Sequence, residues 1–443
     1  MARSDFQWTN ESVLLLAGSE DPISAVERLA REKVLEAMDA GWVGPPYNPI
    51  RIADLMGIPV EPNVDIPDAR TIATGSGLKI EFNPMRPRER VRFSLAHEVA
   101  HALFPDVAKQ TRNRGGNTVV HDDWQLETLC NVAAAEFVMP VGSLPPLDKV
   151  PRIEDLMLER RKFDVSAEAF LIRVVKASLE PLAMAIAAPN AEGRYKVEYV
   201  LNSESWEDPS KVRNSGQIEA LAKKITAIGQ TSRADVQWGP GVGEVHVECV
   251  GIPSHPGANL PRVALLMRME KPAGAEDPLA AVYGDVLQPV AEGMKTVVFL
   301  VNDQSKAWGG GVAREAARKY PHAQVEFSAW FSGIPKDERL GKVFYSRAAA
   351  DITIAAIVAQ SGVGPSTQSR LRYTALERAF QDLYLNSKEA HASIHMPRLG
   401  TGAAGGSWPA IEDLVRQTLV RNDVAVTIYD LPPKRGQYNL GFA

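Results

Sequence analysis

The sequence is poor in cysteine, has no large excess of charge of one sign, and contains no apolar run long enough to cross a membrane. Its 443 residues include two cysteines, Cys130 and Cys249, which excludes a disulfide framework and a cysteine-rich zinc module. The net charge of −5 provides no general field that would attract nucleic acid or an anionic membrane. A composition of 45% hydrophobic and 23% charged residues is that of an ordinary globular chain.

We expect no export signal at the amino terminus. Residues 1–5 lead into a polar stretch, and the apolar patch at 13–18 is too short for the core of a signal peptide. Apolar runs elsewhere, such as residues 182–188, fall short of the ~20 residues that span a bilayer. We therefore expect a cytoplasmic protein with no membrane partner and no direct nucleic-acid binding.

The pattern of the chain predicts three parts. Helical periodicity dominates residues 20–180, strand-like runs with one helix near 218–228 follow in residues 181–270, and strands alternate with helices over residues 278–435. A stretch rich in proline and charge at 271–278 is a linker by composition. We expect a multidomain α+β and α/β protein: a mainly helical front domain, a mixed α+β middle segment, and an α/β domain with a mainly parallel sheet.

The front domain contains an H-E-x-x-H pattern, from His97 to His101, within a predicted helix. Positions four apart stack on one helix face, so the two imidazoles can converge on a single cation. Leu95, Val99 and Leu103 form a separate apolar row for packing. Glu98 points to the flank, where its carboxylate can take the proton from a water that zinc activates. The pattern predicts a zinc site with Glu98 as the catalytic base.

Catalytic zinc usually has a third protein ligand. The candidates downstream are His121, Asp122, Asp123, Glu127 and Glu136. We favour Glu127, one turn into the predicted helix 124–138, with Asn131 behind it as a hydrogen-bond partner for a ligand. Glu136 is expected to be a surface carboxylate, and His121 an exposed loop residue.

At these residues the chain resembles the ImmA/IrrE metallopeptidases. The resemblance rests on residues 92–101, 127–140 and 163–170, and extends over about residues 20–180. It implies a zincin-like endopeptidase with Zn²⁺ held by His97, His101 and Glu127, and with Glu98 as the base. Members of this family typically cleave a helix-turn-helix repressor. This chain carries no such partner domain that we can identify, so a target repressor would be a separate protein.

The back part has two glycine-rich loops, each between a predicted strand and a predicted helix. One covers residues 302–311 and the other residues 400–409. Glycines let backbone N–H groups approach a phosphate closely, and a helix N-terminus adds favourable dipole charge. Both loops are expected at the carboxyl ends of sheet strands, where ligands bind in open α/β folds. The pair predicts a ligand that contains a diphosphate.

This part resembles macro domains, most closely the one at the end of the ALC (amplified-in-liver-cancer) chromatin remodeller. The resemblance covers about residues 278–435 and rests on residues 284–286, 301–303, 308–311, 357–360 and 392–400. It implies binding of ADP-ribose, with Asp285 at the adenine and both loops at the diphosphate. The implied binding residues are Asp285, Asn302, Asp303, Gly309, Gly310, Gly311, Gly400, Thr401, Gly402, Ala403, Ala404, Gly405 and Gly406.

Two positions depart from the macro domains that remove ADP-ribose from carboxylates. Those enzymes use a lysine after the third motif's strand and an aspartate in the last glycine loop, where this sequence has Gln360 and Ala404. Neither residue can form a Schiff base or act as a general base. The resemblance therefore favours a reader of ADP-ribose. His395 is interpreted as a buried structural histidine.

Three hypotheses follow from the sequence. The preferred one is a zinc endopeptidase controlled by free, protein-linked or polymeric ADP-ribose, with a repressor or an ADP-ribosylated protein as its substrate. The second is an ADP-ribose sensor whose peptidase part is an inactive scaffold. The third is an ADP-ribosyl hydrolase or phosphatase in the back part.

Overall fold

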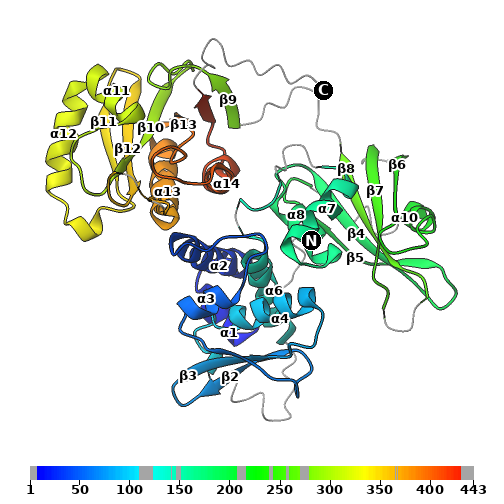
Figure 1. Cartoon of the computed structure of the whole chain (residues 1–443). Coiled ribbons are helices and arrows are strands. Elements are labelled where there is room, and N and C mark those ends of the chain that lie inside the picture. Colours follow the sequence, from blue (N-terminus) through cyan, green and yellow to red (C-terminus); the bar gives the residue numbers. More distant parts are fainter. Residues whose placement is uncertain are drawn as a thin grey trace. The chain divides into compact units, whose positions relative to one another are not determined.

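The computed structural model describes residues 7–108, 123–140, 142–145, 151–206, 216–238, 243–255, 259–269, 279–364, 366 and 368–430 (Figure 1). It separates into two compact units, one formed by residues 1–37 and 42–275 and the other by residues 38–41 and 276–443. The expected linker at 271–278 lies outside the described residues. The expected mixture of α+β and α/β architecture is confirmed, and the described residues form three separate sheets.

The front part of the first unit combines helices with a small sheet. The helices are α1 (Glu11–Ala17), α2 (Pro22–Asp39), α3 (Ile50–Leu55), α4 (Arg88–His101) and α6 (Asp123–Val138). The sheet contains β1 (Val60–Pro62), β2 (Ala69–Thr74) and β3 (Gly77–Phe82) in the order β1-β3-β2. The sequence predicted a mainly helical domain here and identified none of these strands. These strands were missed because they are short and half exposed, with polar side chains that hide the alternation of a buried strand.

Helices α4 and α6 pack against each other, and each has buried apolar residues. Leu95 and Val99 of α4 are buried, as are Leu129 and Phe137 of α6. Leu103, the third member of the predicted row, lies beyond the end of α4 and is half buried. The packing leaves the histidine face of α4 directed toward α6, as the contacts below establish.

Glu136 corrects one expectation. It was expected to be a surface carboxylate, but its side chain is buried and paired with Arg173, which also donates to the carbonyl oxygen of Met139. Arg173 belongs to α8 (Ala167–Ala177), and the pair therefore ties α8 to α6. The spacing along α6 could not reveal this, because the partner lies in another helix.

The middle segment forms a five-stranded antiparallel sheet with helices packed against it. Its strands are β4 (Leu182–Pro189), β5 (Tyr195–Asn202), β6 (Thr231–Gln237), β7 (Glu244–Ile252) and β8 (Arg262–Met269), in the order β5-β4-β8-β7-β6. Alternate residues of β4, β7 and β8 form an apolar core with α10 (Gly216–Ala222). Helices α7 (Ile153–Phe163) and α8 contact the sheet through β7 and through β4 and β5, respectively.

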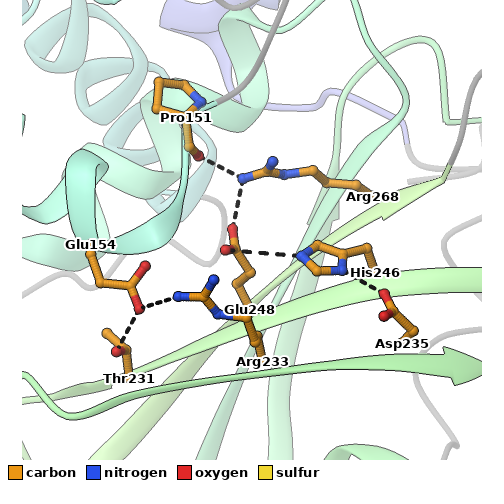
Figure 2. Close-up of polar contacts among 8 residues, drawn as sticks. All are labelled: Pro151, Glu154, Thr231, Arg233, Asp235, His246, Glu248 and Arg268. Atoms are coloured by element: carbon orange, nitrogen blue, oxygen red, sulfur yellow. Dashed lines mark hydrogen bonds and ion pairs between the residues drawn. The ribbon is translucent and has the colours of Figure 1, made fainter.

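A polar network joins the start of α7 to this sheet (Figure 2). Arg268 on β8 donates to the Pro151 carbonyl oxygen at 2.6 Å and to the Glu248 carboxylate at 2.7 Å. Glu154 accepts hydrogen bonds from Thr231 and Arg233 of β6, at 2.8 and 3.0 Å. Burial opposes ionisation of Glu154, but these donors outweigh it and lower its pKa. The network fixes where α7 lies on the sheet.

The buried ion pair in this network gives a first prediction. Arg268→Met removes the guanidinium that faces Glu248, a side chain 1% exposed. We expect this part of the molecule to lose about 3–5 kcal/mol of unfolding free energy, because a buried carboxylate loses its counter-ion. The double variant Glu248→Leu/Arg268→Met should be considerably more stable, because no charge is left buried. Hydrogen exchange of β7 measures both; equal losses in the single and double variants would contradict the expectation.

The second unit contains a six-stranded mixed sheet. Its strands are β9 (Leu279–Tyr283), β10 (Met294–Asn302), β11 (Val343–Arg347), β12 (Ile352–Gln360), β13 (Ala392–Pro397) and β14 (Val426–Asp430), in the order β11-β12-β10-β13-β14-β9. All neighbouring pairs are parallel except β11 with β12. The helices are α11 (Gly311–Lys319), α12 (Pro321–Ser332), α13 (Tyr373–Ala390) and α14 (Trp408–Thr418).

The predicted alternation of strand and helix occurs in this unit, with additions. β9, β11 and α12 were not predicted, and α12 contributes Phe327 and Phe331 to a core that also contains Phe299 of β10. The parallel order brings the carboxyl ends of β12, β10 and β13 to one edge of the sheet. No helix among the described residues has the length and apolar content needed to cross a bilayer.

Candidate functional site

The two histidines of α4 converge on one carboxylate of α6. Nε2 of His97 lies 2.9 Å from Oε2 of Glu127, and Nε2 of His101 lies 3.8 Å from Oε1 of the same side chain. The ring centroids of the histidines are 5.0 Å apart. The structure therefore brings together the three residues that the sequence proposed as metal ligands.

The other ring nitrogens also have partners on α6. Nδ1 of His97 lies 3.0 Å from Oδ1 of Asn131, and Nδ1 of His101 lies 3.4 Å from Sγ of Cys130. Asn131 thus lies beside His97, one of the two histidines that the sequence proposed as ligands. The contact of Cys130 was not predicted; its position three residues after Glu127 was the available signal, because residues three and four apart share a helix face.

The charge around His97 favours a positively charged ring in the absence of a metal. Burial alone would lower the pKa of His97, but its hydrogen bond to Glu127 and the nearby carboxylates of Glu127 and Glu98 outweigh burial and raise it. A bound cation would take the place of this proton at Nε2, where the same negative charge is available to stabilise it.

Glu98 is held from outside its own helix. The hydroxyl of Thr71, on β2, lies 2.7 Å from Oε2 of Glu98 and 3.1 Å from its backbone oxygen. The Glu98 side chain is buried, rather than simply at the flank of the helix as the sequence suggested. Thr71 could not be found from the sequence, because the strand that carries it was not predicted.

The donor set suits zinc. Two imidazole nitrogens and a carboxylate are ligands that catalytic zinc uses. Among the residues that the structure describes, His97, His101 and Cys130 also form a group whose donor atoms lie within 4.8 Å of one another. Of the other candidates, Asp123 begins α6, Glu136 is paired with Arg173, and His121 and Asp122 lie outside the described residues.

In the second unit, the loop after β10 is tied to the loop after β12. The Asp303 carboxylate accepts a hydrogen bond from the Gly362 N–H at 2.7 Å, and the Asn302 side chain accepts from the N–H groups of Gln304 and Ser305. Asp303 is buried. These two expected ligand residues therefore use their side-chain oxygens to shape the loops that surround them.

The glycines of the first loop border open space. A Cβ atom built on Gly309, Gly310 or Gly311 would have no neighbour within 4 Å, and Gly311 has φ of +54°. Gly310 is the N-cap of α11 and supplies no side-chain cap, so the first N–H groups of the helix are accessible to a ligand. Trp308 anchors the loop, because its ring packs against Phe299 and Phe327.

The second glycine loop is more closely packed. The Ala404 carbonyl oxygen accepts hydrogen bonds from the N–H groups of Arg370 and Leu371, and a Cβ atom on Gly406 would lie 2.5 Å from Cδ2 of Leu371. Gly400 and Gly405 have φ of +69°. Thr401, Gly402 and Ala403 form its exposed tip. The loop thus contains two kinds of residue. Some glycines are required by a positive φ or by close packing, and the residues at the tip are exposed.

Asp285 and Gln360 occupy the remaining positions of interest. Asp285 is exposed after β9 and accepts from the Leu287 N–H and the Gln288 amide at 3.0 and 2.9 Å. Gln360 ends β12 and donates to the Gly362 carbonyl oxygen at 3.2 Å. Asp285 therefore follows the carboxyl end of β9 and Gln360 lies at that of β12, just as the two glycine loops follow the carboxyl ends of β10 and β13.

His395 is a buried part of the sheet. It is 0% exposed, with Nε2 lying 2.9 Å from the Ser393 hydroxyl and Nδ1 lying 3.3 Å from the Tyr429 hydroxyl. Burial, together with the charge of Lys295, lowers the pKa of His395 to about 4. A neutral imidazole inside the sheet has a structural role, as the sequence analysis proposed.

This depressed pKa predicts a loss of stability in acid. Below pH 6.5 the unfolded chain protonates this histidine, whereas the folded unit does not until the pH approaches 4; stability therefore falls across this window, by up to about 3 kcal/mol. His395→Gln should flatten the dependence, and His322→Gln, at an exposed position of α12, should not. Protection factors of β13 between pH 6.5 and 4.5 measure the effect. Parallel curves for unaltered protein and His395→Gln would refute the prediction.

Comparisons with known proteins agree with this two-part arrangement. No protein-family profile matches the chain. Its amino-terminal part is similar to the radiation response metalloprotease IrrE of Deinococcus deserti, with 33% identity over 116 residues, or 24% of this chain and 38% of that protein. Chromodomain-helicase-DNA-binding protein 1-like of Danio rerio is 31% identical over 158 residues, or 33% of this chain and 15% of that protein.

Among solved structures, a macrodomain protein from Streptomyces coelicolor matches with 29% identity and a TM-score of 0.31, covering 35% of this chain and 99% of that one. The matches to the two curated relatives support the resemblance predicted from the sequence, in which an IrrE-like metalloprotease segment and a macro-like domain are joined in one chain. The chain spans less than two fifths of the length of either curated relative.

Proposed function

We propose that the protein is a zinc-dependent endopeptidase whose activity or targeting is controlled by ADP-ribose bound in its macro-type domain. The observation that carries the peptidase proposal is the convergence of His97 and His101 on Glu127, with the Glu98 carboxylate held beside them by Thr71. The similarity to IrrE supports it.

His97, His101 and Glu127 would hold the zinc ion. When bound, zinc would polarise the scissile carbonyl and lower the pKa of the attacking water. Glu98 would accept the proton from this water and pass it to the nitrogen of the leaving amine. Thr71, by donating to Oε2 of Glu98, would keep the carboxylate in one orientation during both transfers.

The edge of the small sheet suits an extended peptide. Within the described residues β2 pairs with β3 alone, so it is an edge strand and no strand pairs with its other side. Thr71 places this strand directly beside Glu98. A substrate that added to β2 as a further strand would gain main-chain hydrogen bonds while its backbone lay next to the base. This geometry favours an endopeptidase that binds an extended segment of a protein.

The second unit is proposed to bind ADP-ribose through the loops after β10 and β13. The open glycines at 309–311, the accessible start of α11 and the similarity to macrodomain proteins support this assignment. Gln360 and Ala404, in place of a lysine and an aspartate, favour binding without removal of ADP-ribose. The ligand would be ADP-ribose that is free, linked to a protein or part of a polymer, and the protein substrate would be a repressor or an ADP-ribosylated protein.

Glu98→Gln tests the peptidase proposal. We expect cleavage to fall by about 10²–10⁴-fold, because an amide cannot act as the general base, while ADP-ribose binding is unchanged. Zinc-loaded protein is incubated with cell lysate, with and without ADP-ribose or its polymer, and new peptide termini are identified by mass spectrometry. Coupling predicts that one form of ADP-ribose changes the cleavage rate, typically by about 5–150-fold.

An Asp285→Ala variant provides the reciprocal control. It should keep basal cleavage but lose the response to ADP-ribose, because Asp285 lies in the proposed ligand site of the second unit, whereas Glu127 belongs to the first. Equal cleavage with and without every form of ADP-ribose would refute the coupling, while cleavage that survives Glu98→Gln would refute the assignment of the base.

Gly310→Val tests the ligand site of the macro-type domain. The added side chain enters open space, so we expect little change in stability but at least about tenfold weaker ADP-ribose binding by isothermal titration calorimetry. Gly406→Val is the matched comparison: it should destabilise the unit by about 1–3 kcal/mol, because its Cβ atom would meet Leu371 at 2.5 Å. Unaltered binding by Gly310→Val would contradict the assignment of this loop.

A further inference from the structure

Helix α6 presents three polar side chains to the histidines of α4. Glu127, Cys130 and Asn131 are spaced i, i+3 and i+4, and therefore lie along one face. Glu127 lies beside the Nε2 atoms of both histidines, whereas Cys130 and Asn131 each lie beside an Nδ1 atom. One face of α6 therefore lies beside both ring nitrogens of His97 and of His101.

The two Nδ1 contacts are chemically different. An imidazole that gives its Nε2 lone pair to a metal carries its proton on Nδ1, and this proton needs an acceptor. For His97 the acceptor is the amide oxygen of Asn131, at 3.0 Å. For His101 the structure offers the sulfur of Cys130, at 3.4 Å, a normal length for a hydrogen bond to sulfur.

Burial makes the sulfur contact important. Cys130 is 0% exposed and His101 is 3% exposed, so the pair lies in the packed seam between α4 and α6. Removal of a buried acceptor costs more free energy than removal of an exposed one, because bulk water cannot take its place as the partner of the donor. A change at Cys130 should therefore alter how firmly the His101 ring is held.

We propose that Cys130 is a positioning residue that accepts the Nδ1–H of His101 on its sulfur and orients Nε2 toward the metal. This inference rests on the proposed zinc site. Cys130 acts through His101 and is not itself a ligand, because its sulfur contacts the Nδ1 side of the ring whereas Glu127 lies on the Nε2 side.

Three variants of the full-length protein test this role by zinc affinity, measured by competition with a chelator. Cys130→Ala removes the acceptor and should weaken zinc binding by about 10–100-fold, the usual effect of losing a partner behind a ligand. Cys130→Ser retains an acceptor and should bind within a few-fold of the unaltered protein. Cys249→Ala is the matched control, because it removes the other buried cysteine, on β7, and should leave zinc affinity unchanged.

Circular dichroism of the metal-free variants checks that the helices are retained. Equal zinc affinity of Cys130→Ala and unaltered protein would overturn the inference. Failure of Cys130→Ser to restore affinity would also overturn it, because a hydroxyl can accept the same proton. If the unaltered protein binds no zinc, the proposed function fails together with the inference, and this outcome is distinct from the other two.

Substitution of Co²⁺ for zinc provides the spectroscopic test. We expect no sulfur-to-cobalt charge-transfer band in the unaltered protein, and a shift of the visible ligand-field bands in Cys130→Ala but not in Cys249→Ala, because His101 changes its orientation. A charge-transfer band that disappears in Cys130→Ala would identify Cys130 as a direct ligand and overturn the positioning role.

Discussion

The packing of α4 against α6 is the constraint on which the candidate metal centre depends. His101 of one helix and Cys130 of the other, whose side chains meet between them, are 3% and 0% exposed. Polar groups at such a seam must find partners within the protein, since an unsatisfied buried group is costly. The ring nitrogens of His97 and His101 meet this requirement through side chains of α6. The same contacts also bring together the donor atoms of the candidate metal site.

The first unit extends this arrangement through ion pairs between neighbouring elements. Asp164, at the end of α7, accepts from Arg88 and Arg92 near the start of α4. Glu168 of α8 receives two hydrogen bonds from Arg262 of β8. The end of α7 is therefore tied to α4, and α8 is tied to the middle sheet. A conformational change in that sheet would have a contiguous path of contacts to α4, although coupling itself requires two states that a ligand distinguishes.

In the macro-type unit, side chains and glycines have separate tasks. The carboxylate of Asp303 and the amide of Asn302 hold the backbone of their own loops, while Gly309 and Gly310 leave space open. Such an arrangement fixes backbone N–H groups before a ligand arrives, which reduces the ordering that binding would otherwise require. Several positions inferred from the macro resemblance are thus scaffold as well as ligand candidates, a distinction that only their hydrogen bonds reveal.

The sequence determined the features that depend on local spacing. The four-residue step between His97 and His101 places both on one helix face, and the alternation of strands and helices after residue 278 fixes an α/β unit. The tertiary structure alone decided what comes from other elements: Thr71 beside Glu98, Cys130 behind His101, Arg173 against Glu136, and the small sheet of β1, β2 and β3. Periodicity states which face of an element is apolar, but the register between two elements follows from how their side chains interdigitate, and that information is distributed over the whole core.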